Sequence, residues 1–296
     1  MLTTQKLQTI ENWIYANARP VEKAKWNVVF NKGTKDELVC EMLKYQNDDG
    51  GFGNGFEADI LTPESAAIPS AEAIFMAQDY DLDLTVDWAK KLYKWFENTA
   101  QDTPSFWEGV PKSIEDYPHA PWWGYSPDTV FTPNPCAVVA SAMLLHGTDS
   151  QKELAERIAE KCIDFLMNNT CMQHDIYCLQ RLIISLQAIN SPLITEQVME
   201  KFNQDMIKDT CLDESKYLEY VTQPLDFVYS PKSQWYNILK DAIPGNLAYW
   251  ERTLSDDGCW QPNFSWGVDT DTSHQVTKNW SGYIAVKRVK ILKAFA

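Results

Sequence analysis

The chain has 296 residues, of which 45% are hydrophobic, and a formal net charge of −15. This acidity argues against a surface that binds the phosphates of nucleic acid, and against a polybasic membrane anchor. No apolar run is long enough to span a membrane, so we expect no integral membrane association. The seven cysteines are scattered and odd in number, and we expect no signal peptide before the first amphipathic pattern. We therefore expect a cytoplasmic protein with reduced thiols.

Helical patterns follow one another along the chain, and no segment shows the alternation typical of a strand. Thr3 or Thr4 can cap a first helix, and Pro20 suits the first position of a second one. Residues from about 100 to 132 hold five prolines and three tryptophans, which predicts a long irregular loop of the kind that is often functional. The other expected helices cover 36–45, 71–78, 86–96, 137–146, a stretch opened by a capping box at Ser150, 174–189, 192–208, 234–242, 246–253 after a break at Pro244, and a last segment with Ala285, Val289, Leu292 and Ala296 on one face.

One short segment occurs twice. Residues 46–52 have the sequence Gln-Asn-Asp-Asp-Gly-Gly-Phe, and residues 254–260 repeat it in altered form as Leu-Ser-Asp-Asp-Gly-Cys-Trp. Glycine lets the preceding helix end sharply, and Asp49 or Asp257 can accept hydrogen bonds from the amides of the turn. The aromatic residue, Phe52 or Trp260, can then pack on the neighbouring helices. The repeat predicts a fold built from helical pairs, with a structural role for both turns.

Residues 46–52 resemble the Gln-x-x-Asp-Gly-Gly-Phe repeat of squalene and oxidosqualene cyclases and of the β subunits of protein prenyltransferases. Residues 257–260 resemble a degenerate copy of that repeat. The chain is also similar to small bacterial prenyltransferase-like proteins, in which an acidic segment follows the turn; here that segment holds Glu57, Asp59 and Glu64. The resemblance implies an all-α fold, a single-domain α/α toroid of antiparallel helix pairs over residues 1–296 with a central cavity. It is specific for the fold and not for an activity.

The catalytic motifs of that superfamily are missing or eroded. The chain has neither the Asp-x-Asp-Asp acid of the cyclases nor an Asp-Asp-x-x-Asp string that would bind diphosphate through magnesium. The resemblance implies a zinc site made of Asp257, Cys259 and His274, because prenyltransferases hold zinc with an Asp, a Cys two residues later and a His. Cys259 also aligns with Gly51, so the alternative is a small residue in a tight turn. Another group, Cys171, His174 and Cys178, shares one helical face and is expected to pack in the core.

A further group of candidates combines carboxylates with aromatic rings. The candidate catalytic residues are Glu57, Asp59 and Asp128. The candidate ligand-binding residues are His119, Trp122, Trp123, Tyr125, Asn134, Trp266 and Trp280. If the helices close into a ring, the loops that carry these residues would meet at one mouth. Carboxylates beside aromatic walls suit acid/base catalysis on a sugar, or contact with a cation; the alternative is solvated acids and buried tryptophans.

The leading hypothesis is a prenyltransferase- or terpenoid-cyclase-like protein that binds an apolar, isoprenoid-type small molecule. One alternative is a carbohydrate-active enzyme with paired carboxylates on a helical toroid. The other is a non-catalytic binding or scaffold protein. The three hypotheses thus include enzymes and non-enzymes, and none of them requires nucleic acid or a membrane.

Overall fold

The computed structural model describes residues 2–103, 105–127 and 130–296. Helices account for 61% of the structure, and the described residues form no strand, so the prediction of an all-α fold is confirmed. The chain divides into two compact units: unit 1 contains Met1–Glu41 and Ile207–Ala296, and unit 2 contains Met42–Met206. The expectation of a single domain stays a prediction. Within the described ranges, no helix has the length and apolarity needed to cross a membrane.

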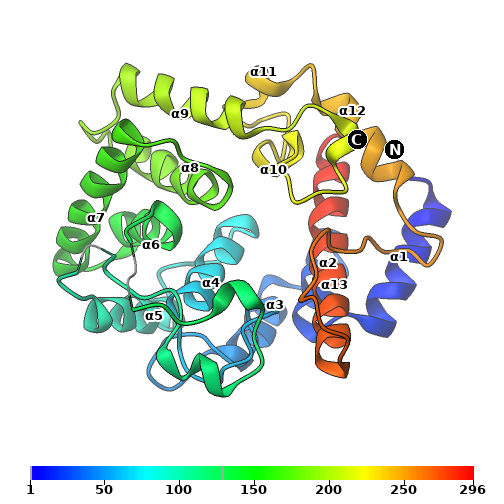
Figure 1. Ribbon diagram of the computed structural model, residues 1–296, viewed down its shortest axis with the longest axis horizontal. Helices are drawn as coiled ribbons and strands as arrows, with labels where there is room; N and C mark the ends of the chain where they lie inside the picture. The colour runs from blue at the N-terminus through cyan, green and yellow to red at the C-terminus, as the bar shows by residue number, and fades with distance from the viewer. Residues whose placement is uncertain (1, 104, 128–129) are drawn as a thin grey trace. The chain divides into compact units, whose positions relative to one another are not determined.

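Unit 2 is built around α6 (Pro133–His146), whose side chains are buried from Pro135 to Leu144. Small residues such as Ala137 and Ala140 let other helices approach closely, and α6 packs against α4, α7 and α8 (Figure 1). The elements of this unit are η1 (Leu43–Tyr45), α4 (Ala67–Asp79), α5 (Asp87–Thr99), η2 (Lys112–Asp116), η3 (Pro121–Trp123), α6, α7 (Asp149–Asn168), α8 (Gln173–Ala188) and most of α9 (Glu196–Asp209).

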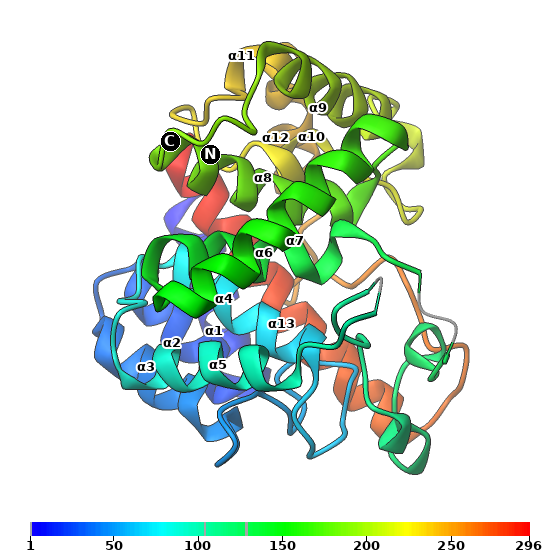
Figure 2. The same ribbon diagram turned by 90° about the vertical axis from the view of Figure 1, so that its left-hand side faces the viewer.

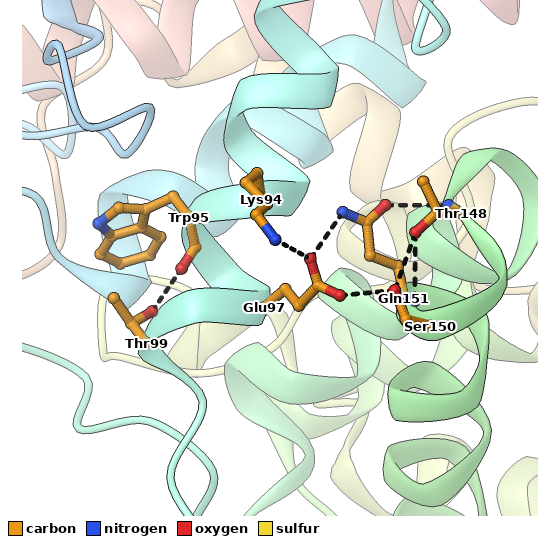
Figure 3. Close-up of polar contacts among 7 residues, drawn as sticks. All are labelled: Lys94, Trp95, Glu97, Thr99, Thr148, Ser150 and Gln151. Carbon is orange, nitrogen blue, oxygen red and sulfur yellow. Dashed lines mark hydrogen bonds and ion pairs between the residues drawn. The ribbon is translucent and has the colours of Figure 1, made fainter.

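The start of α7 is joined to α5 by one carboxylate, that of Glu97 (Figure 3). Its Oε1 accepts a hydrogen bond from Ser150 Oγ at 2.7 Å, and its Oε2 accepts one from Gln151 Nε2 at 3.4 Å and from Lys94 Nζ at 3.0 Å. The capping box of α7 is formed by Thr148 and Gln151. The prediction that Ser150 opens the box was wrong, because a Thr-x-x-Gln pattern lies two residues earlier and leaves Ser150 free to bind α5.

We expect Glu97→Gln to lower the free energy of unfolding by about 1 kcal/mol at neutral pH, the usual size for a hydrogen-bonded, partly solvated charge. The hydrogen bond from Ser150, followed by that from Lys94, lowers the pKa of Glu97. A lowered pKa in the folded state stabilises the protein above the ordinary glutamate pKa, and this stabilisation disappears as the pH falls through the folded-state value. The difference from the wild type should therefore shrink below about pH 4.

Urea unfolding at several pH values measures this effect. Glu160→Gln, a change of an exposed acid on α7, the helix that Glu97 of α5 contacts, is the matched control and should alter stability little at any pH. A Glu97→Gln deficit that stays constant from neutral to acidic pH would show that the carboxylate charge contributes nothing to this contact.

Unit 1 joins the two ends of the chain. Its long helix α13 (Asp271–Ala294) packs against α1 (Thr4–Asn17) and α2 (Pro20–Val29) (Figures 1 and 2). The backbones come close at Gly282, where an added Cβ would lie 2.9 Å from the Cβ of Ala18. The remaining elements are most of α3 (Lys35–Met42), η4 (Glu214–Lys216), α10 (Pro224–Phe227), α11 (Tyr236–Leu239) and α12 (Ile243–Arg252).

The repeated Asp-Gly segment forms the same turn in both units. In unit 2, the N–H of Gly50 donates to the carbonyl of Asn47 at 3.0 Å, and the N–H of Asn47 donates to the carbonyl of Gly51 at 2.8 Å. In unit 1 the equivalent bonds join Gly258 to Ser255 at 3.0 Å and Ser255 to Cys259 at 3.1 Å. The two glycines have φ angles of 98° and 93°. The sequence repeat is therefore a structural repeat.

Each turn lies directly on the backbone of another helix. A Cβ on Gly50 would be 2.5 Å from the carbonyl oxygen of Lys91 in α5, and a Cβ on Gly258 would be 2.6 Å from that of Thr9 in α1. Asp49 accepts the N–H of Gly51 at 3.0 Å, as predicted. The aromatic residues that end the two segments are buried, Phe52 completely and Trp260 almost completely. The structural role predicted for both turns is confirmed.

Several predicted helix boundaries need correction. Helix α9 begins at Glu196 and not at Pro192, because Thr195 caps it by accepting the N–H of Val198 at 3.2 Å. Pro244 does not break a helix but stands in the first turn of α12, where a missing N–H costs nothing. Of the three residues expected on one buried face, Cys171 and Cys178 are buried, whereas His174 is exposed.

Candidate functional site

In unit 2, the acidic loop that follows the first turn runs beside the long irregular loop. The N–H of Ala120 donates to the carbonyl of Asp59 at 3.0 Å, and the N–H of Leu61 donates to that of Pro118 at 3.2 Å. Between these bonds, Ile60 and His119 form an isolated antiparallel bridge. The two loops that carry Asp59 and His119 are thus brought together within one unit.

The side chain of Asp59 is held by a tryptophan of the long loop. Trp123 Nε1 donates to Asp59 Oδ1 at 2.8 Å, and Asp59 is only 1% exposed. Ile60, Val110 and Ile114 form a small core on which Trp123 packs. A buried carboxylate that accepts an indole N–H is suited to hold the ring in one orientation. Acid/base chemistry at the surface of these loops would then depend on carboxylates that are less buried than Asp59.

The surface of this loop pair carries more acids and rings. Tyr125 donates its backbone N–H to Glu115 Oε1 at 2.7 Å and its hydroxyl to Glu108 Oε1 at 3.2 Å. Trp122 is 49% exposed, Glu57 is half-buried and Asp128 lies outside the described residues. Residues 57–64 and 108–125 are hereafter called the acidic–aromatic surface. Glu108 and Glu115 were not predicted as site residues. They lie in an irregular loop, and its sequence gives no reason to prefer one acidic residue over another.

Asn134 lies at the start of α6 and contacts α8. Its N–H donates to Asp175 Oδ1 at 3.2 Å, and its side-chain oxygen accepts from Cys178 Sγ at 3.5 Å. Burial raises the pKa of Asp175, and it raises the pKa of the nearby Cys136 thiol to about 12. Thiols in this environment stay protonated at neutral pH and are poor nucleophiles.

In unit 1, Trp280 belongs to a row of aromatic rings in edge-to-face contact. The centroids are 5.9 Å apart for Tyr220 and Phe264, 5.4 Å for Phe264 and Trp280, and 5.4 Å for Trp280 and Tyr283. Tyr220 is 54% exposed, and the other three rings are half-buried. We call these four residues the aromatic row.

Two indole N–H groups in this region lack acceptors. The Nε1 atoms of Trp280 and of Trp266 are buried, and neither has a hydrogen-bond partner within the described part of the chain. Trp266 lies in the irregular segment 261–270, which carries Phe264 and leads into α13. Buried indole N–H groups normally find a partner, so this pair is unusual.

The residues predicted to hold zinc are not gathered into a metal site. Cys259 is buried in the second turn, where its N–H donates to Ser255 Oγ at 3.1 Å, while Asp257 is exposed. His274 Nε2 lies 2.7 Å from Asp269 Oδ1. Across residues 2–103, 105–127 and 130–296, no three His, Cys, Asp or Glu side chains form a group that could hold a metal ion. The geometry agrees with the alternative in which Cys259 replaces glycine in a tight turn.

Comparison with protein-family models, with curated proteins and with solved structures gave no match to this chain.

Proposed function

We propose that the chain is an α/α toroid of the terpenoid-cyclase and prenyltransferase type, and that it binds an apolar small molecule on the aromatic row of unit 1. The toroid is supported by the repeated turn, which lies on α5 in one unit and on α1 in the other. It is also supported by the packing of the last helix against the first two. Both features are expected where helix pairs repeat and the two ends of the chain meet.

The binding function rests on the aromatic row together with the two indole N–H groups that have no acceptor. Half-buried rings in edge-to-face contact present an apolar surface, and indole donors beside them can orient a ligand that carries one oxygen. Neither N–H has accessible surface, so a ligand oxygen reaches them only after the groups that cover them shift. An isoprenoid alcohol fits this description, with an apolar chain and a single hydrogen-bonding group.

A second candidate function is carbohydrate binding at the acidic–aromatic surface of unit 2. The observation that favours it is the exposed ring of Trp122 beside Trp123, which Asp59 fixes in place, with Glu108 and Glu115 close to Tyr125. Sugars stack on exposed rings and use carboxylates for hydrogen bonds and for acid/base catalysis.

The two candidates are separated by equilibrium dialysis with farnesol and with cellohexaose. We expect Trp280→Ala to weaken farnesol binding about tenfold, because it removes a large apolar contact, and Trp280→Phe to weaken it less. Trp13→Ala, a change of a half-buried tryptophan outside the row in the same unit, is the matched control and should have no effect.

Trp122→Ala should leave farnesol binding unchanged. If cellohexaose binds instead and this variant abolishes its binding, the carbohydrate candidate replaces the apolar one. Binding of neither probe by the folded wild-type protein would favour a scaffold.

A further inference from the structure

The unpaired donors of unit 1 limit the kind of oxygen that a ligand of the aromatic row can carry. The Nε1 atoms of Trp266 and Trp280 are buried, and neither has a hydrogen-bond partner within the described part of the chain. An indole nitrogen donates one hydrogen bond and accepts none. Over residues 2–41 and 207–296, which make up unit 1, no buried or half-buried residue has a buried side-chain oxygen without a partner. What these two tryptophans lack is therefore an acceptor.

Side chains that neighbour Trp280 on α13 do not supply this acceptor. The side-chain oxygen of Asn279 accepts from Gln275 Nε2 at 3.0 Å. The hydroxyl of Ser281 donates to Gln261 Oε1 at 3.2 Å, and this bond also ties the start of segment 261–270 to α13. Buried indole N–H groups normally have an acceptor, because a buried donor without one is costly. In unit 1 that acceptor has to come from another molecule.

A ligand oxygen that only accepts matches these donors better than one that also donates. A carbonyl oxygen has two lone pairs and no proton. An alcohol can accept an indole N–H, but its own O–H then needs an acceptor, and the buried side-chain oxygens of unit 1 already have partners. A donor left unmet among apolar rings weakens binding. The hydrogen-bonding groups of this region therefore favour a carbonyl over a hydroxyl.

A carboxylate also only accepts, but it would bring a negative charge to a row of apolar rings. The ammonium of Lys25 lies beside the row, 5.0 Å from the ring centroid of Tyr283. It already lies 3.8 Å from Glu22 Oε1, and the Lys25 side chain is only 6% exposed. Removing a carboxylate from water is costly unless it gains a close partner, so a neutral carbonyl is favoured.

We infer that the ligand of the aromatic row is an apolar molecule whose polar group is a neutral carbonyl, as in a ketone or an ester. Its oxygen accepts from the indole N–H groups of Trp266 and Trp280 once the groups that cover them have shifted. This inference rests on the proposed function, because it concerns the same rings. It narrows the ligand class to apolar molecules that have no O–H donor.

Equilibrium dialysis with geranylacetone, and with the secondary alcohol obtained by reducing it, tests the inference. The two probes differ only at the carbon that carries oxygen, and we expect the wild type to bind the ketone about tenfold more tightly, as one unmet donor implies. The double variant Trp266→Phe and Trp280→Phe keeps two apolar rings without the N–H groups and should bind the ketone about tenfold more weakly than the wild type. Trp13→Phe, a change of a half-buried tryptophan outside the row in unit 1, is the matched control and should have no effect.

A second measurement uses the wild-type protein and does not depend on how the variants fold. In proton–nitrogen correlation spectra, the indole N–H resonances of Trp266 and Trp280 should move saturably to higher proton shift as the ketone is added. Equal binding of ketone and alcohol, both weakened by Trp280→Ala, would overturn the carbonyl and leave the proposed function standing. Tighter binding of farnesoic acid than of the ketone would overturn it in favour of a carboxylate. If no probe, farnesol included, binds in a way that Trp280→Ala weakens, both the inference and the proposed function fail.

Discussion

Gly50→Ala and Gly258→Ala are each expected to lower the free energy of unfolding by about 3 kcal/mol, at the upper end of ordinary single substitutions. Both positions have φ angles above 90°, a region that residues with a Cβ rarely adopt. The added methyl group would also lie 2.5 Å from Lys91 O in unit 2, or 2.6 Å from Thr9 O in unit 1. Because these neighbours are backbone atoms of a helix, they cannot move aside without displacing the helix.

Urea unfolding of the variants tests this expectation, and Gly245→Ala is its control. Gly245 lies in α12 with nothing within 4 Å of a built Cβ, so alanine there should stabilise the protein by up to about 1 kcal/mol. A loss below about 1 kcal/mol at both turns would mean that neither turn carries the strain that its geometry implies. An effect at one turn alone would mean that the repeat is not energetically equivalent in the two units.

The helical fold could be predicted because its signals are local. Pro20 does begin α2, and the two Asp-Gly segments do form equivalent turns, since glycine, proline and capping residues act on their immediate neighbours. The errors arose where two caps compete within a few residues. The capping box begins at Thr148 and not at Ser150, and α9 follows Thr195 and does not begin at Pro192. In both cases the threonine hydroxyl accepts a backbone N–H, that of Gln151 or of Val198, which composition alone does not reveal.

The candidate sites were predicted less completely because their contacts join distant parts of the chain. Asp59 and Trp123 were both selected as acid and aromatic candidates, but only the structure pairs them. Trp266 and Trp280 were also selected as candidates, but the lack of an acceptor for their buried indole N–H groups depends on contacts that no sequence pattern shows. Residue types can suggest a chemistry, whereas the absence of an acceptor is visible only in three dimensions.

Glu22→Gln should lower the free energy of unfolding by about 3 kcal/mol, and Glu22→Ala by somewhat more, the range expected when one partner of a buried ionic group is removed. The carboxylate is fully buried. It accepts from Arg19 Nε at 2.8 Å and from the terminal nitrogen of Arg19 at 2.7 Å, and it lies 3.8 Å from Lys25 Nζ. The side chains of Arg19 and Lys25 are themselves only 11% and 6% exposed, so either substitution removes a buried negative charge that lies beside both cations.

Part of the effect has another origin, since Glu22 is also an acid in the first turn of α2, where the helix dipole favours negative charge. Glu196→Gln isolates that part, because Glu196 occupies the first turn of α9 but is exposed. The control should cost no more than about 0.5 kcal/mol. If Glu22→Gln costs as little as the control in urea unfolding, Arg19 and Lys25 must find water or other acceptors when the carboxylate is lost, and the group stabilises α2 only through its dipole.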